Sequence, residues 1–247
     1  MRKLAIIGLG VWIAILWLIF VTAQQVPFLR ESNLADYLAG MGGATAVVII
    51  ALGIGLRILG DPDPTIQTLP VGLAVGIGVI ALITLGVGAL NILYGYVLWL
   101  AVAILGLISW RTIANALRTI FRSIGTNLHP AEILLAALIA FALAISLINC
   151  LAPLVANDAL VYHLNLPKIY VDSHHLARLP FNVYANMPHN GEMLYTALYA
   201  MAGETGARGF YFLLIVIASL TLYWAARAHS TRLAALVATS AFIVQPL

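Results

Sequence analysis

Residues Val71–Leu90 read VGLAVGIGVIALITLGVGAL, a stretch without a single charged side chain. A run of about 20 apolar residues is long enough to cross a bilayer as an α-helix. Six further apolar stretches lie on either side of it: Leu4–Thr22, Tyr37–Leu59, Ile92–Trp110, Ala131–Leu151, Gly209–Arg227 and Leu233–Leu247. The sequence therefore predicts an all-α fold, a polytopic transmembrane bundle of about seven spans.

The composition of the whole chain supports the same fold class. Of 247 residues, 63% are hydrophobic and 9% are charged, and the mean hydropathy is +1.03. Water-soluble domains carry about 25% charged residues, so a soluble fold could not bury this much apolar surface. The net charge of +3 forms no basic patch, which indicates membrane lipid and no nucleic acid as partner. The single Cys150 excludes an intrachain disulfide and a zinc site of paired cysteines.

The placement of lysine and arginine predicts the orientation of the spans. Short cytoplasmic loops carry an excess of these residues. With the N-terminus in the cytoplasm, the outer side receives only four of them beyond the first span: Arg30, Lys168, Arg178 and Arg208. The inner side receives Arg2, Lys3, Arg57, Arg111, Arg118, Arg122, Arg227 and Arg232. The loop 152–208 is then extracytoplasmic.

The chain divides into three parts. Residues 1–110 hold four N-terminal spans, 111–130 form a cytoplasmic amphipathic connector, and 131–247 hold one span, the outer loop and two further spans. The first span follows Arg2-Lys3 like a signal peptide, but it exceeds the usual apolar region of about 7–15 residues, so we expect a retained helix. The last span stops without a polar flank, and we expect the chain to be the N-terminal part of a longer protein.

Two further patterns concern packing and the membrane surface. Glycines recur at close spacing in the second and third spans, where small residues let helices approach closely: Gly40, Gly42, Gly43, Gly72, Gly76 and Gly78. In the connector, three arginines recur on one face of a helical pattern: Arg111, Arg118 and Arg122. This pattern predicts an interfacial helix on the anionic cytoplasmic leaflet.

Most of the remaining polar residues lie in the outer loop 152–208. Asp158 opens a helical pattern that places Tyr162 and Asn165 on the same face, and Pro167 is expected to kink or end this helix. A second helix is predicted over Gly191–Ala202, with Asn190 as its N-cap. Residues 179–186 between them are predicted to form an extended, aromatic loop. The loop therefore holds two juxtamembrane helices.

Three short motifs in this loop resemble a known family. They are Asp158-Ala-Leu-Val-Tyr162-His163-Leu-Asn-Leu-Pro167-Lys168, Pro180-Phe181-Asn182-Val-Tyr184-Ala-Asn186-Met-Pro188 and Gly191-Glu192-Met-Leu-Tyr195. Together they resemble the first external loop of GT-C superfamily membrane glycosyltransferases, nearest to the protein O-mannosyltransferase and aminoarabinose-transferase group. The resemblance covers roughly residues 131–247. The chain departs from the family in having Asn157-Asp158 where many members have paired acidic residues, and in its four preceding helices.

The resemblance implies an inverting glycosyltransferase that takes its sugar from a polyprenyl-phosphate donor on the outer face of a bacterial plasma membrane. Asp158 is then the general base toward the acceptor, and a cation among Lys168, Arg178 and Arg208 stabilises the departing phosphate. The substrate-binding candidates are Tyr162, His163, Lys168, Arg178, Asn182, Tyr184, His189 and Glu192. No metal ligands are assigned, and the cofactor is left open, a divalent metal included.

Each of these residues also has a structural explanation. Asp158 can cap a helix, Lys168 can reach to the membrane interface, and Glu192 suits the first turn of a helix through its dipole alone. The outer tyrosines fit an interfacial aromatic belt. The histidines of the loop lack the i, i+4 spacing of metal ligands.

Two other function classes stay open at this stage. A transporter would carry ionisable residues inside its spans or paired broken helices, and neither stands out. A non-catalytic membrane scaffold would tolerate changes at Asp158 and present a flat apolar patch in place of a cleft.

Overall fold

The computed structural model describes residues 34–123, 129–152, 158–180, 182–186 and 190–244. Over these residues the chain is helical and contains no β-strand, which confirms the all-α class. The α-helices are α3 (Leu34–Ile58), α4 (Leu69–Ala89), α5 (Gly95–Ser123), α6 (Pro130–Leu151), α7 (Asn165–Ser173), α8 (Asn190–His229) and α9 (Arg232–Ile243). A π-helical turn, η1 (Ala159–His163), and a 3₁₀ turn, η2 (Val183–Asn186), complete the set.

Five of these helices are long and apolar enough to cross a membrane, which indicates an integral membrane protein. They are Ala35–Ile58, Leu69–Ala89, Gly95–Ser123, Pro130–Leu151 and Asn190–His229. The predicted first span, Leu4–Thr22, lies outside the described residues. The predicted last span, Leu233–Leu247, corresponds to the 12-residue α9, which at about 1.5 Å per residue is shorter than a bilayer core. The seven-span count is therefore not confirmed.

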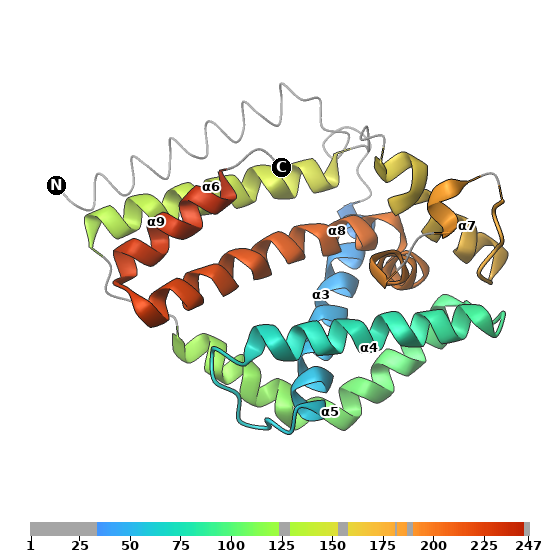
Figure 1. The fold of residues 1–247 in the computed structure, drawn as a ribbon, viewed down its shortest axis with the longest axis horizontal. Helices are drawn as coiled ribbons and strands as arrows, with labels where there is room; N and C mark the ends of the chain where they lie inside the picture. The colour runs from blue at the N-terminus through green and yellow to red at the C-terminus, as the bar shows by residue number, and fades with distance from the viewer. Residues whose placement is uncertain (1–33, 124–128, 153–157, 181, 187–189, 245–247) are drawn as a thin grey trace.

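Helix α3 lies at the centre of the bundle and contacts α4, α5 and α8. Figure 1 shows it crossing behind α4 at a steep angle, with α6 and α9 on the far side of α8. The contacts of α3 are built from small residues. Near its start, Gly40 and Gly43 pack against α8 at Gly206 and Ala202, and near its end Gly55 packs against Gly72 of α4. The bundle is therefore held together around one glycine-rich helix.

The crossing of α3 and α4 brings the two backbones into direct contact. A side-chain carbon added at Gly76 would meet the carbonyl group of Ala51, and one at Gly55 would meet the carbonyl oxygen of Gly72. This confirms the predicted packing role of the glycines at the helix crossings. Gly42 and Gly78 differ, because no heavy atom lies within 4 Å of a carbon added there.

Helix α5 continues without interruption to Ser123, where the sequence predicted a span ending at Trp110 and a separate connector from 111. The physical reason is that neither glycine nor proline occurs between Gly106 and Ser123, so nothing breaks the helix. Figure 1 shows that the helix changes direction along its length. Its second half binds the proline-rich turn after α3, where Asn115 donates to the carbonyl oxygen of Pro62 (3.1 Å) and to Oδ1 of Asp63 (2.7 Å).

Helix α8 consists of two pieces that meet at Gly203. This residue has φ 69° and ψ −172°, a backbone conformation open to glycine and strained for other residues. The first piece agrees with the helix predicted over Gly191–Ala202, and the second contains the predicted span Gly209–Arg227. Figure 1 shows the two pieces running in different directions, with the first seen nearly end-on. The break at Gly203 therefore separates the piece that ends at Ala202 from the piece that holds the apolar stretch 209–226.

At one end of the bundle, α7 and the residues after it contact the segment between α4 and α5. We call this end, which holds the described residues of 90–99 and 158–203, the α7 end. The amide of Leu93, between α4 and α5, donates to the carbonyl oxygen of His174 at 3.0 Å. The His174 ring stacks on Tyr94 with 4.1 Å between ring centroids. At the same end, Trp99 of α5 donates from Nε1 to the carbonyl oxygen of Met201 at 2.8 Å. The end of α7, the segment between α4 and α5, the start of α5 and the first piece of α8 are thereby joined.

Candidate functional site

Asp158 is exposed and directly precedes η1, at the α7 end of the bundle. The sequence predicted one helix from Asp158 to Pro167, and this was wrong in detail. The π-helical turn ends at His163, Leu164 separates it from α7, and α7 begins at Asn165. Pro167 therefore lies in the first turn of the second helix, where its missing N–H costs no hydrogen bond.

Tyr162 and Tyr184 form a stacked pair next to Asp158. Their ring centroids are 4.6 Å apart and the ring planes differ by 14°. The loop that carries Tyr184 forms the 3₁₀ turn η2, where an extended chain was predicted. Asn182 fixes this turn, because its Oδ1 accepts from the amide of Tyr184 at 3.0 Å and its Nδ2 donates to the carbonyl oxygen of Val161 at 3.4 Å. The aromatic pair is thus held from both sides.

His163 and Glu192 form a second pair in the same cluster. Nδ1 of His163 lies 3.0 Å from Oε1 of Glu192. The Glu192 side chain is 12% exposed and that of His163 is 42% exposed, so the carboxylate is enclosed and the imidazole faces outward. Tyr195 of α8 also lies near the imidazole, with its ring centroid 6.3 Å from that of His163. The first turn of α8 thereby orients a side chain of η1.

Loss of solvation and the acidic groups of this cluster raise the pKa values of two tyrosines, Tyr162 and Tyr170. The pKa of the Tyr162 phenol is raised, first by loss of solvation and then by the charges of Asp158, Tyr184 and Glu192. The pKa of Tyr170 on α7 is raised by burial and by Glu192. Both phenols therefore stay protonated at neutral pH and keep a proton to donate in a hydrogen bond. The charges of Asp158 and Glu192, which belong to different elements, thus both raise the pKa of the Tyr162 phenol.

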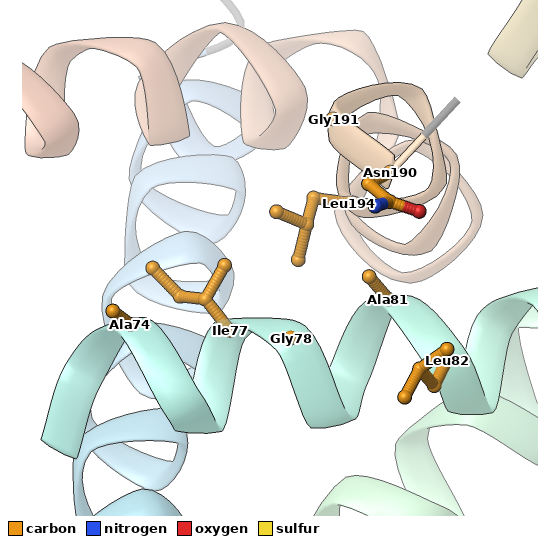
Figure 2. Close-up of a pocket in the computed structure, with 8 residues that line it drawn as sticks. All are labelled: Ala74, Ile77, Gly78, Ala81, Leu82, Asn190, Gly191 and Leu194. Carbon is orange, nitrogen blue, oxygen red and sulfur yellow. The ribbon is translucent and has the colours of Figure 1, made fainter. Parts of the chain in front are cut away.

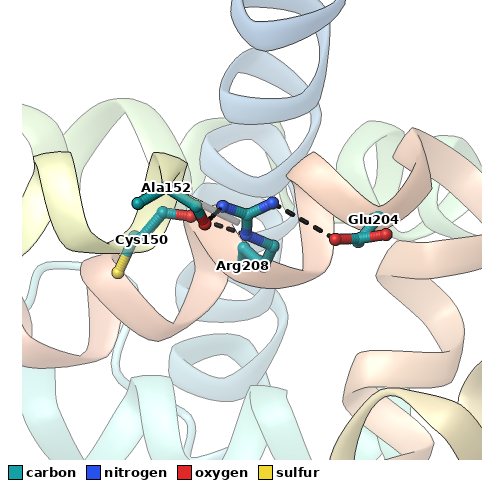
Figure 3. A network of polar contacts seen from close by, with 4 residues as sticks. All are labelled: Cys150, Ala152, Glu204 and Arg208. Carbon is teal, nitrogen blue, oxygen red and sulfur yellow. Dashed lines mark hydrogen bonds and ion pairs between the residues drawn. The ribbon is translucent and has the colours of Figure 1, made fainter. Parts of the chain in front are cut away.

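The three cations proposed for the donor phosphate differ in their surroundings. Lys168 and Arg178 are exposed, and within the part of the chain that the structure describes neither side chain makes a hydrogen bond or ion pair. Arg208 is committed to other contacts, as Figure 3 shows. Its Nε donates to the carbonyl oxygen of Cys150 at 2.7 Å, its Nη2 donates to that of Ala152, and Nη1 pairs with Glu204 at 3.2 Å. Arg208 is therefore an anchor for the end of α6.

We expect Arg208→Gln to lower the free energy of unfolding by about 2–4 kcal/mol, because three charge-assisted contacts of a side chain only 10% exposed are lost. The melting temperature of the purified protein in detergent measures this loss. Arg178→Gln is the matched control, since it removes an exposed arginine. Equal melting temperatures for the two variants would contradict the anchoring role.

The structure brings together most of the residues that the sequence singled out. Tyr162, His163, Asn182, Tyr184 and Glu192 form one cluster, and Asp158 lies beside it. Lys168 and Arg178 are exposed outside this cluster, and His189 lies outside the described residues. Among the described residues, no three His, Cys, Asp or Glu side chains lie close enough together to hold a metal ion.

Tyr195 is the residue of this cluster that the sequence analysis did not assign. It lies three positions after Glu192 and therefore on the same side of the first piece of α8. That spacing is the signal by which it could have been found. The anchoring contacts of Arg208 had no such signal, because they join residues 58 and 56 positions apart.

An apolar groove of about 330 Å³ lies between α4 and the start of α8. Figure 2 shows Ile77 and Ala81 of α4 facing Leu194 and Asn190 of α8. Asn190 is the one polar residue among the described residues of its lining. At about 100° per residue, Glu192 lies about 160° around the first piece of α8 from Asn190 and Leu194, so the groove and the polar cluster occupy different faces of that helix.

Comparison with models of known protein families, with curated proteins and with solved structures finds no match for this chain.

Proposed function

We propose that this protein is a membrane glycosyltransferase of the GT-C type, which moves a sugar from a polyprenyl-phosphate donor to an acceptor on the extracytoplasmic face. The observation that carries the proposal is the exposed carboxylate of Asp158 beside the stacked Tyr162–Tyr184 pair, at one end of a bundle of membrane-type helices. The resemblance of the loop motifs to that superfamily supports it.

The chemistry assigns a role to each group. The acceptor oxygen or nitrogen attacks the anomeric carbon of the sugar, the bond from that carbon to the phosphate oxygen breaks, and Asp158 takes the acceptor proton. A general base must lie within hydrogen-bond reach of that proton. Tyr184 is exposed and presents a ring face on which the apolar face of a sugar can pack.

The leaving group of this reaction is a polyprenyl phosphate, which is anionic and lipid-soluble. Lys168 and Arg178 are the exposed cations that suit the phosphate as its charge develops. The apolar groove between α4 and α8 suits the hydrocarbon chain, because its described lining is apolar apart from Asn190. The polar cluster and the apolar groove share the first piece of α8, which suits a substrate with a polar and an apolar part.

The distribution of charge in the spans favours an enzyme over a transporter. A transporter places ionisable residues along its substrate path within the membrane. Here the central apolar stretches of the candidate spans contain no Asp, Glu, Lys or Arg: 37–56, 69–89, 95–110, 133–151 and 209–226. The charged side chains instead gather at the helix ends and in the loop that holds Asp158.

The proposal is tested by supplying polyprenyl-phosphate-linked sugars of several kinds to membranes from cells that produce the full-length protein. We expect release of polyprenyl phosphate from at least one donor above that in matched membranes lacking the protein. Equal release from both kinds of membrane with every donor would count against the proposal.

Glu192→Gln is expected to reduce transfer by about tenfold, less than changes at Asp158 do. The amide keeps the size of the side chain and one acceptor oxygen for the contact with His163, while it removes the charge that orients the imidazole. The initial rate of donor consumption measures the effect. A loss as large as that of Asp158→Asn would move the role of base to Glu192.

A further inference from the structure

The second half of α5, residues 110–123, has three distinct faces. At about 100° per residue, Arg111, Arg118 and Arg122 lie within an arc of about 40° and form a line about 16 Å long. Thr112 and Ala116, about 100–140° to one side, are buried against the protein. One face is therefore packed against the bundle and the neighbouring face is basic.

The third face is apolar and uncovered. Trp110 and Phe121 lie about 80–100° from the arginine line, on the side away from the buried residues. Their exposed fractions are 59% and 69%. An aromatic face this open would be unfavourable in water, but it suits the boundary between lipid headgroups and hydrocarbon. Besides its packed face, this part of α5 therefore has one basic face and one apolar face.

The contacts of α5 fix its rotation. On the packed side, Thr119 donates to the carbonyl oxygen of Pro64 at 3.1 Å, and Asn115 binds Pro62 and Asp63. The direct continuity with the apolar stretch 95–110 fixes its depth. The arginine line therefore has a defined position where the helix leaves the membrane.

Within the described ranges, no carboxylate forms an ion pair with any of the three arginines. Arg118 donates to Oδ1 of Asn115 at 3.1 Å, and the guanidinium of Arg111 lies 5.3 Å from the centroid of the Trp110 ring. The carboxylate of Asp63, on the packed side, accepts a hydrogen bond from Asn115. The line consequently keeps most of its charge available for an external anion.

We propose that residues 110–123 form a binding surface for anionic phospholipids, in which the three arginines hold headgroup phosphates while Trp110 and Phe121 enter the acyl region. Guanidinium groups bind phosphate through two parallel hydrogen bonds, and basic residues at a membrane surface attract anionic lipid. An acidic soluble protein would not account for the exposed aromatic face. This surface is independent of the transferase proposal, since it lies at the other end of α5 from the α7 end.

The test uses the purified protein in detergent with equal amounts of phosphatidylglycerol and phosphatidylcholine, and native mass spectrometry counts the lipids retained. We expect wild type to retain phosphatidylglycerol preferentially. In the variant R111Q/R118Q/R122Q, the ratio of retained phosphatidylglycerol to retained phosphatidylcholine should fall by about fivefold for each arginine removed. The variant R111K/R118K/R122K, which keeps the charges, should retain most of it.

The matched control is R57Q/R227Q, which removes two exposed arginines of other helices and should leave the preference largely unchanged. A preference equal to wild type in the folded triple glutamine variant would overturn the proposal, and so would an equal loss in the control. If the triple variant does not fold, R111Q/R122Q leaves the contact of Arg118 with Asn115 in place and gives the same comparison.

Discussion

Gly76→Ala is expected to destabilise the protein by about 2–3 kcal/mol, although alanine is the better helix former. The added methyl group would meet the carbonyl group of Ala51 at the crossing of α3 and α4. The obstacle is backbone, which cannot rotate away as a side chain can, so the two helices must move apart. Because α3 also contacts α5 and α8, the displacement affects the whole bundle.

Gly78→Ala is the matched control for this prediction. It lies on the same helix two residues farther on, and no heavy atom lies within 4 Å of its added carbon. We expect it to leave stability unchanged or to raise it by about 0.5–1 kcal/mol through helix propensity. The melting temperatures of both variants in one detergent measure the difference. A Gly76→Ala protein as stable as Gly78→Ala would show that the backbones do not touch as the structure has them.

Asp158→Asn is expected to reduce sugar transfer by about 100-fold or more, because it removes the proposed base and keeps the size of the side chain. Asparagine also caps helices as well as aspartate does, so a purely structural role of Asp158 predicts little change. The two explanations thus differ in their outcome. Donor consumption under single-turnover conditions measures the step that the base assists.

Donor binding supplies the control for the Asp158 variant. The base acts on the acceptor proton, so Asp158→Asn should still bind the polyprenyl-phosphate sugar as wild type does. An unchanged melting temperature would show that the variant folds. Weakened donor binding with unimpaired transfer at saturating donor would instead assign Asp158 to substrate binding.

Helix positions follow from the sequence where apolar stretches are long and uninterrupted. The candidate spans α3, α4 and α6 agree with the predicted stretches, because their ends are marked by the charged or proline-containing segments around Arg57, Pro70 and Pro130. The end of α5 was missed because helical propensity continues through Arg111–Ser123 after the hydropathy falls. Hydropathy predicts where the apolar part of a span ends, but the helix itself can continue beyond that residue.

The sequence predicted which residues form the candidate site better than it predicted how they are arranged. The loop motifs named Tyr162, His163, Tyr184 and Glu192, which the structure brings together. The π-helical turn could not be foreseen, since it depends on how η1 packs against α7 and α8. The same holds for Arg208, because its partners at the end of α6 are brought to it only by the packing of α6 against α8.

The most direct test of the proposed function is the release of polyprenyl phosphate from a labelled lipid-linked sugar in membranes that carry the full-length protein, with wild type and Asp158→Asn compared at equal protein amounts. The account predicts release by wild type and a loss of about 100-fold or more in the variant. Equal release by the two proteins would contradict the role of Asp158, and release by neither with every donor tested would contradict the transferase itself.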